Sequence, residues 1–350
     1  MIETDALVIG AGPIGLFAVF ELGLQGIATH VVDALDDAGG QCIALYPDKP
    51  IYDIPAVPVS TGRELVHKLM QQIAPFKPTF HLGQQVSDVE RQADGRWRVT
   101  TTRQQQPCQA FLTRTVIIAA GVGAFVTKEL KVDGLPALLG RQVFYRSAPP
   151  AVCADKQVIV LGGDGDAVAN ALALARTGPD QAQSVTLVHR RDVLQASSDQ
   201  LTELAALRQT GKIHFIAGQI TAVQTTGELL TSVVISTPED QTLSLAADVL
   251  LVCLGISPKL GPIAQWGLAM ERKQLCVSLE TFATNEPGIF AVGDIITYPG
   301  KKKLIVSGFH EATLAAFAAA ALIHPEASSV LQYTTSSALL QQRLGVLPTS

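Results

Sequence analysis

Cysteine is scarce in this chain, and its cysteines never occur in close pairs. Five cysteines stand at positions 42, 108, 153, 253 and 276, an odd number at wide spacing. The sequence contains no CxxC and no cluster of cysteine and histidine with the spacing of metal ligands. We therefore expect neither a metal site nor a disulfide scaffold, and this cysteine usage is typical of a reducing compartment.

Charged and aromatic residues are also few. Charged residues make up only 16% of the 350 residues and aromatic residues 5%, whereas 47% are hydrophobic. Such a composition supplies enough apolar side chains for the cores of about two ordinary domains, and it excludes intrinsic disorder. The formal net charge of −5 argues against a surface that binds nucleic acid.

Long apolar runs are missing as well. The first 20 residues lack a basic flank and are interrupted by glycines at 10, 12 and 15. The apolar run 312–323 ends after 12 residues, whereas a membrane-spanning helix needs about 20. We therefore expect a soluble, cytoplasmic protein without a signal peptide or a membrane span.

A glycine-rich turn follows the first expected strand. Residues 6–10 form a β-type run that leads into Gly10-Ala-Gly-Pro-Ile-Gly15, and a helical stretch at 16–26 and a second strand at 29–32 come next. This βαβ unit carries the GxGxxG pattern of dinucleotide sites, in which small residues let a pyrophosphate approach the helix N-terminus. Asp33 ends the second strand, where a partner for a ribose hydroxyl is expected.

A related pattern recurs in the middle of the chain. An expected strand at 157–161 runs into Gly162-Gly-Asp-Gly-Asp-Ala167, and after a helical stretch the strand 184–188 leads into His189-Arg190-Arg191. In the register set by the first strand, Asp164 replaces the middle glycine and would repel a pyrophosphate. One residue later, Gly163 and Gly165 restore two glycines but Val168 takes the third position, and both registers stay open. The two arginines either bind a 2′-phosphate, which selects NADP(H), or form a solvated strand end.

Several long stretches resemble the two-domain flavoprotein reductases of the thioredoxin reductase type, above all the thioredoxin-reductase-like ferredoxin/flavodoxin:NADP+ reductases. These stretches are residues 10–16, 39–47, 51–55, 119–125, 260–268, 288–294 and 298–301. The resemblance implies an α/β fold with two Rossmann-like domains and a homodimer. An FAD-binding domain would comprise 1–120 and 257–350, and an NAD(P)H-type domain 121–256.

The resemblance also implies roles for individual residues. Tyr52 and Tyr333 would stack on the flavin, Tyr333 from the other subunit. Asp294 would bind the FAD ribityl chain; its alternative role is a helix N-cap ahead of Ile295. The positions implied for FAD are Gly10, Gly12, Pro13, Ile14, Gly15, Asp33, Gly40, Gln41, Tyr46, Val86, Gly121, Phe125, Gly293, Asp294 and Thr335. Those for the second nucleotide are Gly162, Gly163, Asp164, Gly165, Arg190 and Arg191.

The chain departs from the thioredoxin reductases in ways that bear on its partners. Their CxxC would fall at Tyr145 and Ala148, so the usual route to thioredoxin is missing and a carrier such as ferredoxin or flavodoxin is favoured. Gln195 stands where the family pattern HRRxxxR has its third arginine, which together with Asp164 argues against ordinary NADPH binding.

Two further features have alternative interpretations. Cys42 stands where glutathione-reductase-type enzymes place a flavin-facing cysteine, and it is either a redox thiol or a buried small side chain. Lys301, Lys302 and Lys303 offer either a cationic edge for an acidic electron carrier or an ordinary solvated loop.

The leading hypothesis is a homodimeric FAD enzyme that transfers electrons between NADPH and ferredoxin or flavodoxin. One alternative is a flavoprotein that does not use pyridine nucleotides and acts on a disulfide through Cys42, with either one FAD or two. The other alternative is a flavin-binding redox sensor without steady turnover.

Overall fold

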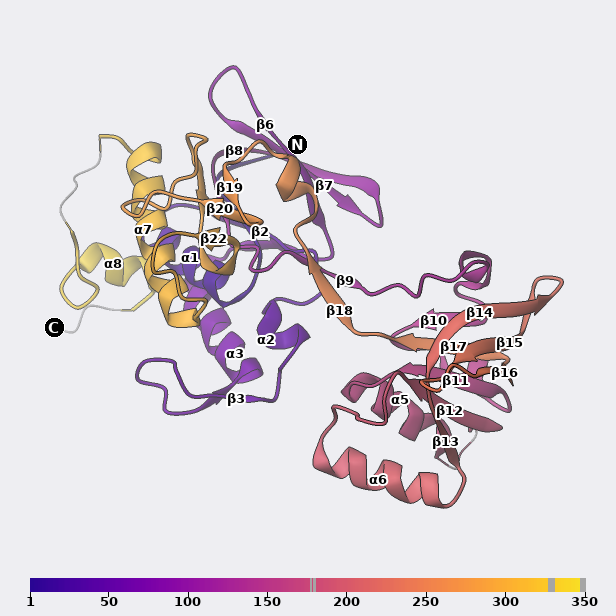
Figure 1. Ribbon diagram of the computed structural model, residues 1–350. Coiled ribbons are helices and arrows are strands. Elements are labelled where there is room, and N and C mark those ends of the chain that lie inside the picture. Colours follow the sequence, from indigo (N-terminus) through magenta and orange to yellow (C-terminus); the bar gives the residue numbers. More distant parts are fainter. Residues whose placement is uncertain (177, 179–180, 327–330, 347–350) are drawn as a thin grey trace. The chain divides into compact units, whose positions relative to one another are not determined.

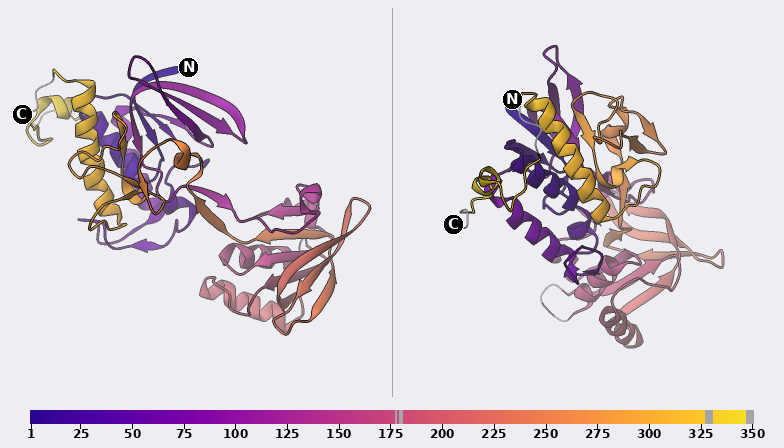
Figure 2. Two further views of the ribbon diagram at one scale, coloured as in Figure 1. Left: turned by 45° about the horizontal axis from the view of Figure 1, so that its top comes forward. Right: turned by 90° about the vertical axis from the view of Figure 1, so that its left-hand side faces the viewer.

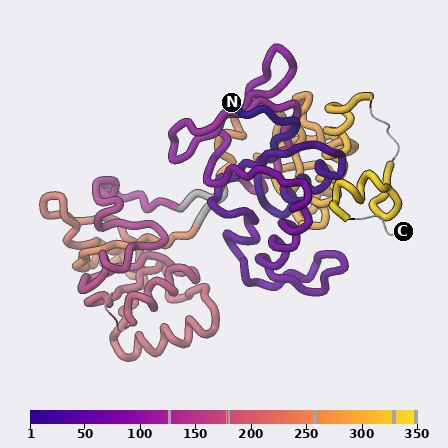
Figure 3. Tube along the Cα trace, turned by 180° about the vertical axis from the view of Figure 1, so that it is seen from behind, coloured from indigo at the N-terminus to yellow at the C-terminus, as the bar shows by residue number. Residues whose placement is uncertain are grey.

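The computed structural model describes residues 1–176, 178, 181–326 and 331–346, without the side chains of 125–127 and 256–258. The chain divides into two compact units (Figure 1). Unit 1 comprises residues 1–125 and 258–350, and unit 2 comprises 126–257. The strands β9 (Ala124–Thr127) and β18 (Ile256–Lys259) pair with each other where the chain passes between the units. The first and last described elements both belong to unit 1 (Figure 3).

Unit 1 is built on a seven-stranded sheet with the order β5-β2-β1-β8-β7-β6, and β21 pairs with the free part of β8. The strands β5, β2, β1, β8 and β21 run parallel, whereas β6, β7 and β8 form an antiparallel ribbon. Their bounds are β1 (Ile2–Ile9), β2 (Thr29–Val32), β5 (Thr79–His81), β6 (Gln85–Arg91), β7 (Trp97–Arg103), β8 (Gln106–Ile118) and β21 (Ile289–Ala291).

The register of this sheet brings three chain segments to one edge. Ile118 at the end of β8 pairs with Ile9 of β1 on one side and with Ala291 of β21 on the other. The residues that follow these three strands therefore meet at the carboxyl edge of the parallel strands. Ligands of open α/β sheets bind at this edge.

The long helices of unit 1 are α1 (Pro13–Leu24), α3 (Gly62–Ile73) and α7 (Ile305–Ile323). Figure 2 shows α7 running alongside α1, and a side chain on Gly308 of α7 would overlap with Ile14. The shorter elements are α2 (Gln41–Ala44), α8 (Ala338–Arg343), β3 (Pro50–Ile51), β4 (Ser60–Thr61), β19 (Met270–Glu271), β20 (Gln274–Cys276), β22 (Ile296–Thr297), and the 3₁₀ helices η1 (Ala74–Phe76), η3 (Gly261–Gln265) and η4 (Gly293–Ile295).

Helix α7 extends beyond the apolar run 312–323. It begins at Ile305 and has 19 residues, because Glu311 interrupts the apolar run without interrupting the helix. Among the described helices it alone has the length and apolar composition of a membrane span. Its alanines at 312, 315, 316 and 319 are fully buried in the core of unit 1. It is therefore a core helix.

Unit 2 has three layers. A parallel sheet with the order β10-β17-β11-β12-β13 carries helices on one face and a three-stranded antiparallel sheet, β14-β15-β16, on the other. The bounds are β10 (Val143–Tyr145), β11 (Gln157–Gly162), β12 (Ser184–His189), β13 (Ile213–Ala217), β14 (Gln219–Thr226), β15 (Leu229–Ser236), β16 (Thr242–Ala246), β17 (Val249–Cys253), α4 (Pro150–Cys153), α5 (Gly165–Ala175), α6 (Ser198–Gln209) and η2 (Leu135–Leu138). A capping box of Ser197 and Gln200 begins α6.

Two histidines of neighbouring strands form a stacked pair in unit 1. His30 Nδ1 and His81 Nε2 lie 2.9 Å apart, and both rings lie edge-on to Phe111. Burial lowers the pKa of both rings, and for His81 the neighbouring His30 lowers the pKa further. The folded protein therefore binds protons at this pair less readily than the unfolded chain does.

Unit 1 is accordingly expected to lose stability as the pH falls below about 6.5, where the unfolded histidines take up protons first. Urea unfolding between about pH 7.5 and about pH 5 measures this loss. His81→Asn should flatten the pH dependence, whereas His67→Asn, a change at an exposed histidine of α3, should leave it unaltered. Equal pH dependence in the wild type and His81→Asn would contradict the assignment.

Candidate functional site

The first glycine turn lies at the carboxyl edge of the unit 1 sheet. Gly10 has a φ of +109°, and a side chain there would overlap with the backbone of Ala119. A side chain on Gly15 would overlap with the carbonyl oxygen of Gly10. These two glycines are required by the packing of the turn itself.

Gly12 has a different environment from these two glycines. It is the N-cap of α1 with a φ of −71°, and the nearest atom to an added Cβ would be the Cα of Gly40 at 3.8 Å. The fold therefore has room for a methyl group at Gly12. Its missing side chain leaves the first turn of α1 open to a ligand from the cavity, where free N–H groups favour an anion.

Asp33 lies immediately after β2, beside this turn. Its Oδ2 accepts a hydrogen bond from the N–H of Ala11 at 2.6 Å, and its Oδ1 accepts one from the N–H of Leu35 at 2.8 Å. Burial raises the pKa of the Asp33 carboxyl, although these two N–H groups lower it. The carboxylate is thus fixed in place and keeps lone pairs for a hydroxyl donor.

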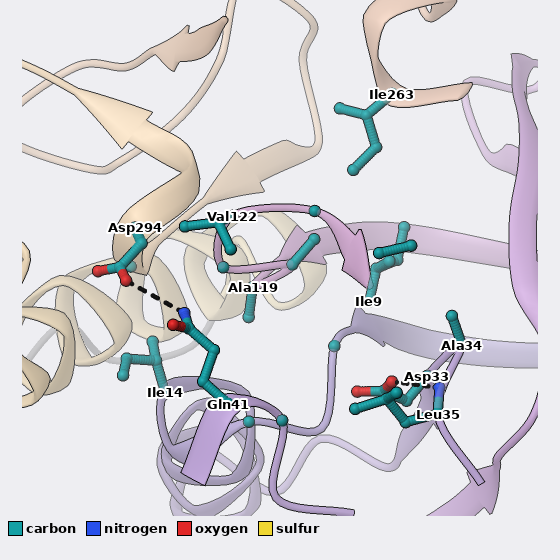
Figure 4. A pocket seen from close by; sticks show the side chains of 18 of the residues that line it. Ile9, Ile14, Asp33, Ala34, Leu35, Gln41, Ala119, Val122, Ile263 and Asp294 are labelled. Carbon is teal, nitrogen blue, oxygen red and sulfur yellow. Dashed lines mark hydrogen bonds between the residues drawn. The ribbon is translucent and has the colours of Figure 1, made fainter. Parts of the chain in front are cut away.

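A cavity extends along the turn, entirely within unit 1. Its volume is about 280 Å³, close to the lower end of the ~300–1,000 Å³ of typical small-molecule sites. Figure 4 shows Asp33 on one side of the cavity and Asp294 with Gln41 on the other. An elongated ligand with hydroxyl groups towards both ends and an anionic middle matches this arrangement.

Asp294 lies within η4, which begins two residues after the end of β21. Its Oδ2 accepts a hydrogen bond from Nε2 of Gln41 at 3.3 Å. The N-cap of η4 is Val292, so the alternative interpretation of Asp294 as an N-cap is wrong. Gln41 and Asp294 are 253 positions apart in sequence, and the meeting of β8 and β21 at one edge brings them together.

Tyr46 and Cys42 lie at this end of the cavity. The Tyr46 hydroxyl and Cys42 Sγ are 3.7 Å apart. Burial raises the pKa of Tyr46 strongly, and Cys42 and Asp294 add to the rise. Cys42 is 1% exposed, and burial raises the pKa of its thiol, so the thiolate is disfavoured. This environment favours the interpretation of Cys42 as a buried small side chain.

Most of the predicted FAD positions line one cavity, but not all. Those that line it are Gly10, Gly12, Pro13, Ile14, Asp33, Gly40, Gln41, Tyr46, Val86, Gly121, Gly293 and Asp294. Gly15 packs behind the turn, Tyr52 and Tyr333 are 71% and 63% exposed, and Thr335 is exposed too. The side chain of Phe125 lies outside the described residues. Sequence reasoning missed the apolar wall from Leu260, Pro262, Ile263 and Trp266, and also Gln84 and Gln85.

Of the three lysines considered as a basic edge, Lys301 is not at the surface. The Lys301 side chain is only 6% exposed and forms an ion pair with Glu311 of α7. It is therefore not available to a protein partner. Lys302 and Lys303 are exposed, and Lys303 also lines the cavity.

The second glycine turn lies between β11 and α5 of unit 2. Asp164 is the N-cap of α5, and its Oδ1 accepts a hydrogen bond from the N–H of Ala167 at 3.0 Å. A side chain on Gly162 would overlap with the carbonyl oxygen of Cys253 and approach Ala167. Gly162, Asp164 and Ala167 therefore occupy the places that Gly10, Gly12 and Gly15 have in unit 1. Of the two registers considered, the one with Asp164 in the middle is correct.

Arg190 and Arg191 directly follow β12 and are exposed. The loop that follows these arginines contacts the glycine turn, because the N–H of Gln195 donates a hydrogen bond to the carbonyl oxygen of Gly163 at 2.7 Å. An ion pair between Asp192 and Arg208 anchors the same loop. The two arginines thus flank the end of unit 2 that carries the glycine turn.

Comparison with known proteins agrees with this architecture. Residues 4–319 match the family model described as pyridine nucleotide-disulphide oxidoreductase. A ferredoxin–NADP reductase of Albidiferax ferrireducens is 54% identical over 99% of this chain and 96% of its own length, and one of Paracidovorax citrulli is 54% identical over 99% and 97%. The thioredoxin reductase structure of Lactococcus lactis covers 92% of this chain and 99% of its own, with a TM-score of 0.58 and 24% identity.

These matches confirm the resemblance and the α/β fold with two Rossmann-like domains. The family model covers most of the chain, and the relatives extend over almost all of it. The chain therefore belongs to the pyridine nucleotide-disulphide oxidoreductase family, among its thioredoxin-reductase-like members that are named ferredoxin–NADP reductases.

Proposed function

We propose that unit 1 binds FAD along the cavity described above. The order of the polar groups along the cavity supports this proposal. Asp33 would bind a ribose, and the N-terminus of α1 beside Gly12 would bind the pyrophosphate. Asp294 with Gln41 would bind the ribityl chain. When bound, FAD supplies the exchange between hydride transfer and single-electron transfer. The residues of the chain hold it, orient it and exclude water from it.

We further propose that the protein transfers electrons between NADPH and ferredoxin or flavodoxin as a cytoplasmic homodimer. The names of the relatives support the nucleotide and the ferredoxin, and the absence of a CxxC from the sequence argues against thioredoxin. Lys302 and Lys303 are the lysines of the basic edge left for an acidic carrier. The exposed rings of Tyr52 and Tyr333 are free to stack on flavins, Tyr333 on that of the second subunit.

Unit 2 is the proposed NADPH site, with Arg190 and Arg191 for the 2′-phosphate. The shape of its turn suits a dinucleotide, but the Asp164 carboxylate occupies the N–H of Ala167 at the place where a pyrophosphate would bind. We therefore expect NADPH to bind, and to bind weakly. The disulfide alternative gains no support, because Cys42 is buried and burial raises the pKa of its thiol.

Anaerobic reduction tests the proposed function. Millimolar NADPH should bleach the flavin absorbance of the purified protein, and added ferredoxin or flavodoxin should then be reduced with steady turnover. No bleaching by NADPH would contradict the pyridine-nucleotide part of the proposal. Bleaching without turnover by either carrier would favour the redox sensor.

Gly12→Ala and Gly10→Ala are expected to separate binding from folding. An alanine methyl at Gly12 would lie 3.8 Å from the Cα of Gly40, an ordinary van der Waals contact, so the apoprotein should fold normally. The affinity for FAD should fall by about tenfold or more, because the methyl enters the phosphate position. The same methyl at Gly10 overlaps with Ala119 and should cost the fold itself, by about 2 kcal/mol or more. Apoprotein melting and FAD titration measure both effects. A Gly12→Ala variant with wild-type FAD affinity would contradict the placement of the pyrophosphate.

A further inference from the structure

A buried carboxylate of α7 contacts the turn that carries Asp294. Glu311 has no exposed surface, and its Oε2 accepts a hydrogen bond from the N–H of Gly293 at 2.7 Å. Its Oε1 accepts hydrogen bonds from the hydroxyl of Tyr298, at 2.7 Å, and from Nζ of Lys301. Two oxygens thus serve three donors from two segments, and sequence reasoning singled out neither the carboxylate nor this cluster.

The stretch Tyr298-Pro-Gly-Lys301 folds so that its two ends reach the same carboxylate. The N–H of Lys301 donates to the carbonyl oxygen of Tyr298 at 3.1 Å, and Gly300 has a φ of +84°. The Lys301 ammonium lies 5.6 Å from the centre of the Tyr298 ring. Burial together with Glu311 raises the pKa of Tyr298 to about 12, so its hydroxyl remains a donor. Tyr298 and Lys301 therefore make their interactions inside unit 1.

The cluster acts on the site through one backbone group. Gly293 has a φ of +83° and begins η4, and its N–H is bonded to Glu311. The next residue is Asp294, whose carbonyl oxygen accepts a hydrogen bond from Nε2 of Gln274 at 3.2 Å. The turn is therefore held by α7 on one side and by β20 on the other.

We propose that Glu311 is a positioning residue of the flavin site: by holding the N–H of Gly293 it fixes the Asp294 carboxylate in the cavity, and Lys301 balances its charge. This inference rests on the proposed binding of FAD in unit 1. A buried ion pair is weak evidence for stability, because apolar residues often replace it at no cost. Its location against the turn is what assigns it to the site.

Glu311→Gln tests the proposal with little change of shape. A glutamine offers one acceptor where the carboxylate offers two, so a donor N–H₂ faces either Gly293 or the Lys301 and Tyr298 pair. We expect the dissociation constant for FAD to rise by about 10- to 100-fold, as for other displaced site groups. Glu311→Gln with Lys301→Met should recover most of the affinity, because the amide is then free to accept from Gly293 and donate to Tyr298.

Glu21→Gln is the matched control. Glu21 is also a buried carboxylate against α7, where it accepts a hydrogen bond from the hydroxyl of Thr313 at 3.3 Å. Among the described residues no hydrogen bond joins it to η4. FAD titration of each apoprotein, together with its melting temperature, should show lost affinity in Glu311→Gln only.

Three outcomes of this experiment are decisive. Wild-type FAD affinity in Glu311→Gln overturns the inference and leaves the proposed function standing. Equal loss of affinity in Glu21→Gln, in proportion to its loss of stability, overturns the inference too, because it shows a structural role alone. A wild-type apoprotein that takes up no FAD overturns the proposed function together with the inference.

Discussion

Asp164→Gly is expected to lower the dissociation constant for NADPH by about 10- to 100-fold, which corresponds to about 1.4–2.8 kcal/mol. The change removes a negative charge from the phosphate position and frees the N–H of Ala167 for the ligand. Glycine is also an adequate N-cap, so α5 should lose only a few tenths of a kcal/mol in stability. The measurement is titration of the enzyme with NADPH, with the KM in steady turnover as a second readout.

Asp164→Asn separates charge from size at the same position. Asparagine keeps the N-cap hydrogen bond and the volume of the side chain but has no charge. We expect Asp164→Asn to gain part of the affinity for NADPH that Asp164→Gly gains in full. Wild-type affinity in both variants would show that Asp164 does not face the nucleotide, and the explanation for weak NADPH binding would fail.

Asp294→Ala is expected to abolish tight FAD binding, with a rise in the dissociation constant of about 100-fold or more, because a charged acceptor for the ribityl chain is lost and Gln41 is left without its partner. Asp294→Asn keeps the size and one acceptor and should show an intermediate affinity. The measurement is fluorescence titration of apoprotein with FAD.

Asp53→Asn is the control for this prediction, since Asp53 is an exposed carboxylate near Tyr46 that does not line the cavity. It should bind FAD like the wild type. If Asp294→Ala retained its flavin through purification, the ribityl end of the site would have to be placed elsewhere.

Local sequence patterns predicted the elements that depend on neighbouring residues. Strand, glycine turn, helix and strand follow one another within 32 residues at the N-terminus, and each part has its own periodicity or turn residues. The same holds for β11, α5 and β12. Each of the two registers of the second glycine turn departs from the glycine pattern at one position, so the sequence alone left the place of Asp164 open. The strand β11 and the N-cap hydrogen bond of α5 settle it in the structure.

The sequence could not predict contacts between distant segments. The low exposure of Lys301 depends on its ion pair with Glu311, which lies ten positions further along the chain. Glu311 belongs to α7, and the apolar run does not show where that helix begins. A lysine in a short basic run is usually solvated, and only a buried carboxylate beside it reverses that expectation. A lone glutamate in an otherwise apolar helical stretch was the available signal, since such a residue is buried only when it is paired.

The number of FAD molecules released per chain tests the central claim most directly. Purified protein, denatured and assayed by chromatography against an FAD standard, should release one FAD per chain, bound in unit 1. Two per chain would favour a second flavin in place of NADPH in unit 2. Colourless protein that takes up no added FAD would contradict the proposed role of the glycine turn and of Asp294 altogether.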